Sequence, residues 1–218
     1  MDKYLNQPVS LHISGRRGHL KGTLVDIGND ILVLHNGTQF LYVPIVHLQQ
    51  LTRCPADEAD FGTPPDPPLE GTSELSYRKV LMSAKGMFSE LYITGSQSVH
   101  GYVTSIMNDF FVFYSPMYHS LYVSMKHLKI LIPYDDQTTP YAMEQEKFPI
   151  HPMPATLSRT FDQQLKKFEG EFVVLDLGEH PGKIGLLKSV SGNLVELVTA
   201  DGASTFINLD HVKTVHKP

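Results

Sequence analysis

VPIVHLQQL, residues Val43–Leu51, is the stretch that decides the fold, because the chain repeats its pattern twice. The pattern returns as VSMKHLKIL at Val123–Leu131 and as INLDHVKTV at Ile207–Val215. In each case a hydrophobic run ends in a histidine, followed by an aliphatic residue, two variable positions and a second aliphatic residue. Recurrence of this kind indicates a repeated structural unit. We therefore predict three copies of one unit, at about Leu5–Leu51, Gly86–Leu131 and Gly170–Val215.

A second set of anchors supports the same alignment. A glycine opens the runs GTLVDI, GYVTSI and GLLKSV, at Gly22, Gly101 and Gly185. Turn-forming pairs follow in each copy, and then come short runs of β-branched and aromatic residues such as ILVLH, FFVFY and LVELV. The histidine motif described above supplies the last strand of each unit. The spacing predicts five short β-strands in each copy.

The predicted fold class is mainly β, with three tandem small Sm-like or SH3-like five-stranded barrels, short helices and proline-rich connectors. Five strands joined by tight turns within fewer than about 50 residues favour a strongly bent sheet whose closure hides its edges. So small a unit buries little apolar surface alone, and three units that pack together would share their cores.

Composition divides the chain into five segments. We predict a first barrel at 1–52, a proline-rich acidic linker at 53–71, a helix plus the second barrel at 72–132, a proline-rich linker at 133–156, and a helix plus the third barrel at 157–218. Thr72 and Ser73 are candidate helix caps, and Gly86 and Gly170 are expected to stop the two helices.

The repeated unit resembles the N-terminal repeats of the spore coat protein B family of bacilli, which also end in a histidine, an aliphatic residue and a lysine. His127-Leu128-Lys129 and His211-Val212-Lys213 match this ending, whereas Gln49 takes the lysine position in the first copy. The family's Gly-Gly-Pro-Glu turn has no counterpart here, nor has its Ser/Lys/Arg-rich tail. The resemblance implies a non-catalytic structural or adaptor protein of the endospore coat. It also implies other spore coat proteins, or the chain itself, as partners.

Net charge and hydrophobicity further restrict the functions that the sequence favours. The net charge is -5, whereas nucleic-acid-binding proteins usually carry excess positive charge. The polar start MDKYLNQPVS predicts synthesis in the cytoplasm without a signal peptide, ahead of a spore coat location. No apolar run approaches the roughly 20 residues that span a bilayer, so we expect no membrane insertion. Cys54 is the single cysteine and cannot form an internal disulfide.

The alternative function is an Sm-like single-stranded RNA-binding protein. Sm proteins contact RNA through an aspartate and an asparagine four residues apart, and the turns DIGNDIL, SIMNDFF and SVSGNLV do not keep that spacing. The first copy has three basic residues against two aspartates, a charge of +1, and the third has three lysines against six carboxylates, a charge of -3. Phosphate binding needs clustered cations, so nucleic acid is the less favoured partner.

The histidines raise the question of a metal site. His47, His127 and His211 occupy equivalent positions, which favours packing against an apolar edge with a ring nitrogen bonded to a backbone carbonyl. No paired metal-ligand spacing occurs, and no P-loop, nucleophile elbow or dinucleotide fingerprint is present. We therefore expect no metal, no cofactor and no enzymatic activity.

The run FFVFY is apolar on both faces of a strand. Alternation places Phe110, Val112 and Tyr114 on one face and Phe111 and Phe113 on the other, which is more apolar surface than one small barrel needs. We therefore expect the second copy to be central. In this hypothesis Phe111 and Phe113 pack on the neighbouring copies or on a second molecule.

Overall fold

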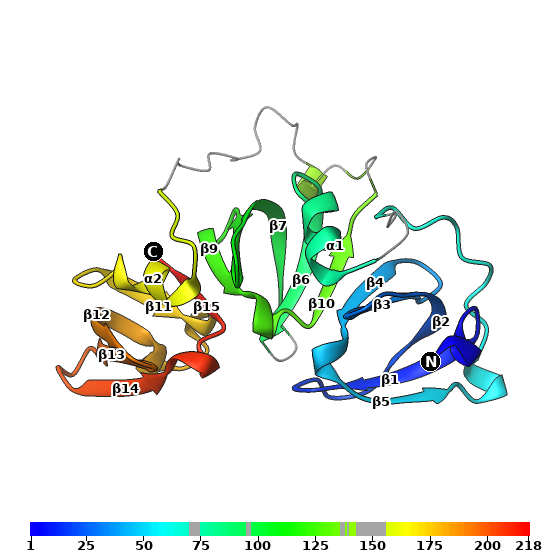
Figure 1. Ribbon diagram of the computed structural model, residues 1–218, viewed down its shortest axis with the longest axis horizontal. Coiled ribbons are helices and arrows are strands. Elements are labelled where there is room, and N and C mark those ends of the chain that lie inside the picture. The colour runs from blue at the N-terminus through cyan, green and yellow to red at the C-terminus, as the bar shows by residue number, and fades with distance from the viewer. Residues whose placement is uncertain (70–74, 95–96, 136–137, 139, 143–155) are drawn as a thin grey trace. The chain divides into compact units, whose positions relative to one another are not determined.

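The computed structural model describes residues 1–69, 75–94, 97–135, 138, 140–142 and 156–218. The protein is mainly β, as predicted. Its strands form an antiparallel sheet in the order β14-β13-β12-β11-β15-β9-β8-β7-β6-β10-β4-β3-β2-β1-β5 (Figure 1). The chain divides into two compact units, unit 1 with Met1–Tyr102 and Leu128–Lys147, and unit 2 with Val103–His127 and Phe148–Pro218. Among the described residues, no helix has both the length and the apolar character needed to cross a membrane.

The first five strands form one antiparallel group, called repeat 1. Neighbouring strands pair in chain order, and the fifth strand returns to pair with the first. A 3-10 turn joins the fourth strand to the fifth. The elements are η1 Asp2–Tyr4, β1 Pro8–Ile13, β2 Leu20–Ile27, β3 Ile31–His35, β4 Phe40–Pro44, η2 Ile45–His47, β5 Leu48–Arg53 and η3 Ala56–Glu58.

Repeats 2 and 3 have the same strand order, and each is preceded by a short α-helix. Repeat 2 comprises α1 Tyr77–Ser83, β6 Phe88–Thr94, β7 Gln97–Ile106, β8 Phe110–Ser115, β9 His119–Ser124, η4 Met125–His127 and β10 Ile130–Pro133, with η5 Pro140–Ala142 after it. Repeat 3 comprises α2 Phe161–Lys166, β11 Phe172–Leu175, η7 Asp176–Gly178, η8 Pro181–Lys183, β12 Ile184–Ser191, β13 Leu194–Val198, β14 Ser204–Asn208, η9 Leu209–His211 and β15 Thr214–His216.

The helix ends agree in part with the sequence signals. Gly86 and Gly170 follow α1 and α2 with φ angles of 82° and 84°, a left-handed conformation that favours glycine. The proposed caps Thr72 and Ser73 lie outside the described residues, and Ser76 is the N-cap of α1. Most of the predicted linker at 133–156 also lies outside them.

The anchor glycines sit at equivalent places on the second strand of each repeat. Gly22, Gly101 and Gly185 lie opposite Val9, Ser89 and Val173 on the first strands. A Cβ atom on Gly22 would come within 2.5 Å of the His35 carbonyl oxygen, and one on Gly185 would come closer still to the Val198 carbonyl. A side chain is excluded at these two positions because the third strand passes too close.

Neighbouring repeats share their cores. The repeat 1 core also contains two residues of β10, and consists of Val9, Leu11, Ile13, Leu20, Leu24, Leu32, Leu34, Leu41, Val43, Ile130 and Ile132. The repeat 3 core likewise contains three residues of repeat 2, namely Phe110, Val112 and Tyr122. The cores of repeats 1 and 3 are therefore each completed by part of repeat 2, as expected for units too small to bury much surface alone.

Candidate interaction surface

The junction between successive repeats is built the same way twice. In unit 1, β10 pairs with β4 through Leu131 opposite Tyr42. In unit 2, β15 pairs with β9 through Val215 opposite Tyr122. Leu131 and Val215 are the last aliphatic residue of the repeated motif, and the two tyrosines occupy the same position on the fourth strand. The fourth strand of one repeat thus receives the fifth strand of the next in one register.

The turn between the second and third strands fixes the helix of the following repeat. The Asp30 carboxylate Oδ1 accepts the backbone N–H of Tyr77 at 2.6 Å, at the first residue of α1. The Asp109 Oδ1 accepts that of Phe161 at 2.8 Å, at the first residue of α2. An aspartate here satisfies one of the unpaired donors at a helix N-terminus. The turn residues therefore tie each repeat to the next.

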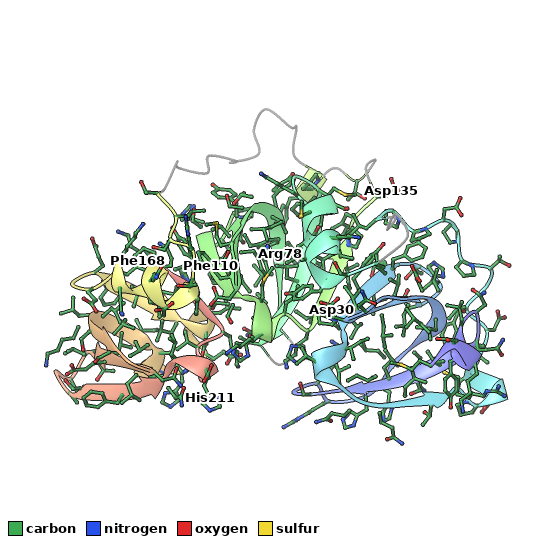
Figure 2. All side chains as sticks on the ribbon, in the orientation of Figure 1. Asp30, Arg78, Phe110, Asp135, Phe168 and His211 are labelled. Atoms are coloured by element: carbon green, nitrogen blue, oxygen red, sulfur yellow. The ribbon has the colours of Figure 1, made fainter. Side chains whose placement is uncertain are left out.

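The aromatic residue of the fourth strand is buried at both junctions. The Tyr42 hydroxyl accepts a hydrogen bond from the Leu69 backbone N–H at 3.1 Å, and burial raises the pKa of Tyr42 to about 12. The Tyr122 ring meets that of Phe168 edge-on, with centroids 5.1 Å apart. Phe110 belongs to the same apolar cluster as Phe168 (Figure 2). Burial at this position thus accompanies pairing with the fifth strand of the next repeat, together with Leu69 of the linker at Tyr42 and Phe168 at Tyr122.

Repeat 3 presents the same position uncovered. Phe206 lies opposite Glu196 on β13, as Tyr42 lies opposite Val33 and Tyr122 opposite Val112. Yet Phe206 is 63% exposed, whereas Tyr42 is 0% and Tyr122 7% exposed. In the part of the chain that the structure describes, β14 pairs only with β13 (Figure 1). The outer surface around it, called the open face, consists of Phe172, Leu186, Leu194, Val198 and Phe206.

Among the described residues, repeat 1 has the complementary feature, a fifth strand with one unpaired side. Within the described residues, β5 pairs with β1 alone, whereas its counterparts β10 and β15 each pair on both sides. Most of its side chains are exposed, at Gln49, Gln50, Thr52 and Arg53. We call this unpaired side of β5 the open edge. Exposed strand edges are templates for pairing with another chain.

The three motif histidines each end a 3-10 turn, in different surroundings. His47 is buried, and its Nδ1 lies 3.1 Å from the Ser14 hydroxyl. His127 Nε2 lies 2.9 Å from the carbonyl oxygen of Asp210, the kind of bond expected of a structural histidine. His211 is exposed (Figure 2). No group of three or more metal-binding side chains that could hold an ion is found among the described residues.

The aromatic strand β8 has the two apolar faces that alternation indicates. Phe111 and Phe113 are 0% exposed, and lie on the opposite face from the contact with repeat 3. That contact is made instead by Phe110 and Val112, which join the repeat 3 cluster. Phe111 and Phe113 are therefore core residues in this structure and are not placed on an accessible surface.

One buried charge escaped the sequence analysis. Asp176 is 2% exposed and accepts the backbone N–H groups of Lys213 at 2.6 Å and Thr214 at 3.2 Å. Its other oxygen pairs with the Lys183 ammonium at 2.7 Å. Asp176 directly follows β11, two residues before Gly178, and its carboxylate positions the start of β15. Nothing in the run EFVVLDLG distinguishes this aspartate from a solvent-exposed one.

A surface hollow of about 500 Å³ lies in unit 1 beside β3 and β4, lined in part by His35, Phe40, Met87, Tyr134 and Asp135. Burial lowers the pKa of His35. Cys54 is not part of this lining; it is half-buried, and burial raises the pKa of its thiol. Neither feature gathers the groups that a nucleophilic mechanism needs.

These observations define a repetitive antiparallel β-protein whose repeats associate by strand pairing. The family model of the YwrJ third domain matches residues 160–215, from the turn before α2 into β15. The Uncharacterized protein YwrJ of Bacillus subtilis (strain 168) is 42% identical over 223 residues, which cover 100% of this chain and 99% of the relative. The chain belongs to the YwrJ family.

Proposed function

We propose that the protein is a non-catalytic structural or adaptor component of the endospore coat, built of three small Sm-like or SH3-like barrels. The pairing of each fifth strand with the first gives the strand order of such a unit, and the register shifts in the second strands of repeats 1 and 3 support strong bending, since bulges bend a sheet. The repeated His-aliphatic-Lys ending supports the coat assignment. The match to a protein of a bacillus is consistent with it.

The open face is the single observation that carries the proposal. Scattered exposed apolar residues are ordinary, but Phe206 occupies a position that is buried in both other repeats. The apolar surface extends across neighbouring strands through a row of directly paired residues, Phe172, Leu186 and Val198. A surface of this kind is suited to contact with protein. Similar faces repeated in an assembly add avidity without needing a strong single site.

RNA binding is the less favoured function. The turn where Sm proteins hold RNA is used here to cap a helix, through Asp30 in repeat 1 and Asp109 in repeat 2. Repeat 3 has Gly192-Asn193 in that turn and carries excess negative charge. Clustered cations, which supply most phosphate affinity, are not provided at these turns.

Localisation in a sporulating bacillus tests the proposal. A fluorescent fusion of the chain should concentrate on the forming spore, and Phe206→Ser should reduce that signal several-fold. Met82→Ser is the matched control, because Met82 is 61% exposed and lies on α1 in unit 1, whereas the open face belongs to unit 2. A fusion that stays diffuse in sporulating cells would contradict the coat assignment. Salt-dependent binding of a labelled single-stranded RNA at physiological salt would favour the alternative.

A further inference from the structure

We infer that the open face and β14 of one molecule receive β5 of a second copy of this chain, head to tail. The inference rests on the proposed function, since it names the partner of the same surface. Two strands with one open side make the pairing possible. Among the described residues, the fourth strand β14 receives no fifth strand, and the fifth strand β5 joins no fourth strand. The chain already joins strands of these two kinds at both internal junctions.

The two internal junctions also set the register. Leu131 lies opposite Tyr42, and Val215 opposite Tyr122. Leu51 holds the equivalent place in the first motif, and Phe206 the equivalent place on β14. Leu51 of the second copy therefore lies opposite Phe206, and the antiparallel ladder continues with Thr52 opposite Thr205 and Arg53 opposite Ser204.

The charges at this register are complementary. The Ser204 hydroxyl donates to the Glu196 carboxylate at 2.9 Å, so an arginine opposite Ser204 would lie next to that carboxylate. Arg53 of the second copy takes this place. The excess charges of the two repeats also have opposite sign, with +1 in the first copy of the unit and -3 in the third. Complementary charge fixes register and suppresses the reverse pairing.

The 3-10 turns fit the same arrangement. At the junction within unit 2, His127 Nε2 lies 2.9 Å from the backbone carbonyl of Asp210 in the next repeat. The equivalent of His127 in repeat 3 is His211, which is exposed. The equivalent of Asp210 in the second copy is Val46, which also precedes the motif histidine and is 74% exposed. A bond from the His211 ring to the Val46 carbonyl would repeat the internal contact. Both groups are accessible for it.

Disulfide trapping between two different variants tests the register. In a Cys54→Ser background, Thr52→Cys on one molecule is mixed with Thr205→Cys on another, because directly opposed strand residues lie within disulfide reach. Thr52→Cys mixed with Ala203→Cys is the control, with the second cysteine displaced by two residues, about 7 Å along the strand. We expect the first mixture to form roughly ten times more disulfide-linked heterodimer than the control, the ratio of a tenfold equilibrium difference.

Sedimentation provides the second readout. The wild-type chain should exceed the mass of one molecule at about 100 µM, and Phe206→Ser should weaken association at least about tenfold, whereas Met82→Ser should not. A single-molecule mass throughout, or equal trapping in both mixtures, would overturn the head-to-tail pairing. If the wild type is monomeric while Phe206→Ser still disperses the fusion from spores, the proposed function stands and only this choice of partner fails.

Discussion

Replacing Asp109 with alanine should loosen the junction between repeats 2 and 3. Its Oδ1 accepts the backbone N–H of Phe161, the first residue of α2. The N-cap residue of α2, Thr160, makes no side-chain cap of its own, so Asp109 supplies the cap from another turn. Loss of such an acceptor costs about 0.5–2 kcal/mol, and with no substitute here we expect about 1–2 kcal/mol.

The equivalent change in repeat 1 should cost less. Asp30 caps α1 through Tyr77, but Ser76 also accepts a bond from the backbone N–H of Lys79, at 3.4 Å. Asp30→Ala therefore leaves α1 with one weak cap, and we expect a loss of about 0.5–1 kcal/mol. Asn193→Ala, at the same turn of repeat 3, should cost less than about 0.5 kcal/mol, because Asn193 caps no α-helix and its bonds to Asn208 and Asp210 are exposed to solvent.

Urea unfolding followed by circular dichroism measures these differences, which suits a chain without tryptophan. A loss of 1–2 kcal/mol corresponds to a fall in Tm of about 2–8 °C for a chain of this size. Asp109→Asn is the matched control, because asparagine caps a helix about as well as aspartate. Equal losses for Asp109→Asn and Asp109→Ala would refute the capping argument. So would a larger loss for Asn193→Ala than for Asp109→Ala.

Three further predictions follow from buried groups. Gly22→Ala should lower the free energy of unfolding by about 1–3 kcal/mol, because the added methyl group clashes with the third strand. Gly182→Ala is the control, since its methyl group would meet only the movable His180 ring, and it should change Tm little. Similar Tm values for both variants would contradict this. Asp176→Ala should lower the free energy of unfolding in urea by about 2–4 kcal/mol, because the buried N–H donors at the start of β15 lose a charged acceptor. A loss below about 0.5 kcal/mol would show that solvent replaces the carboxylate. The pKa of Tyr42 is about 10 in the unfolded chain and about 12 in the folded protein, so about 2–3 kcal/mol of the free energy of unfolding is present below pH 10 and is lost as the pH rises toward 12. Tyr42→Phe should flatten this decline when stability is measured as a function of pH. An unchanged slope would argue against it.

The strands were predictable because their signals are local. Turn residues such as Asn29-Asp30 and Asn108-Asp109, together with runs of branched residues, mark the ends of short strands. The repeated motif adds the information that the same signals recur in one order. These features predicted five strands in each copy and a short helix before the second and third. They also indicated that β8 is apolar on both faces.

The junctions were not predictable, because they depend on partners distant in the sequence. Alternation separated Phe110 and Val112 from Phe111 and Phe113, but it cannot say which pair meets another repeat. The sequence places Asp109 in a predicted turn, yet its partner Phe161 is far along the chain. The exposure of Phe206 likewise depends on the pairing of β14, which cannot be predicted from composition.

Hydrogen exchange at β14 and β5 tests the head-to-tail pairing most directly. Backbone amides of β14, at Ser204–Asn208, and of β5, at Leu48–Arg53, should become protected together as the protein concentration is raised through the association range. The same amides in Phe206→Ser should stay fast. Protection that is independent of concentration, or that appears on one strand without the other, would contradict the pairing of β14 with β5 of a second copy.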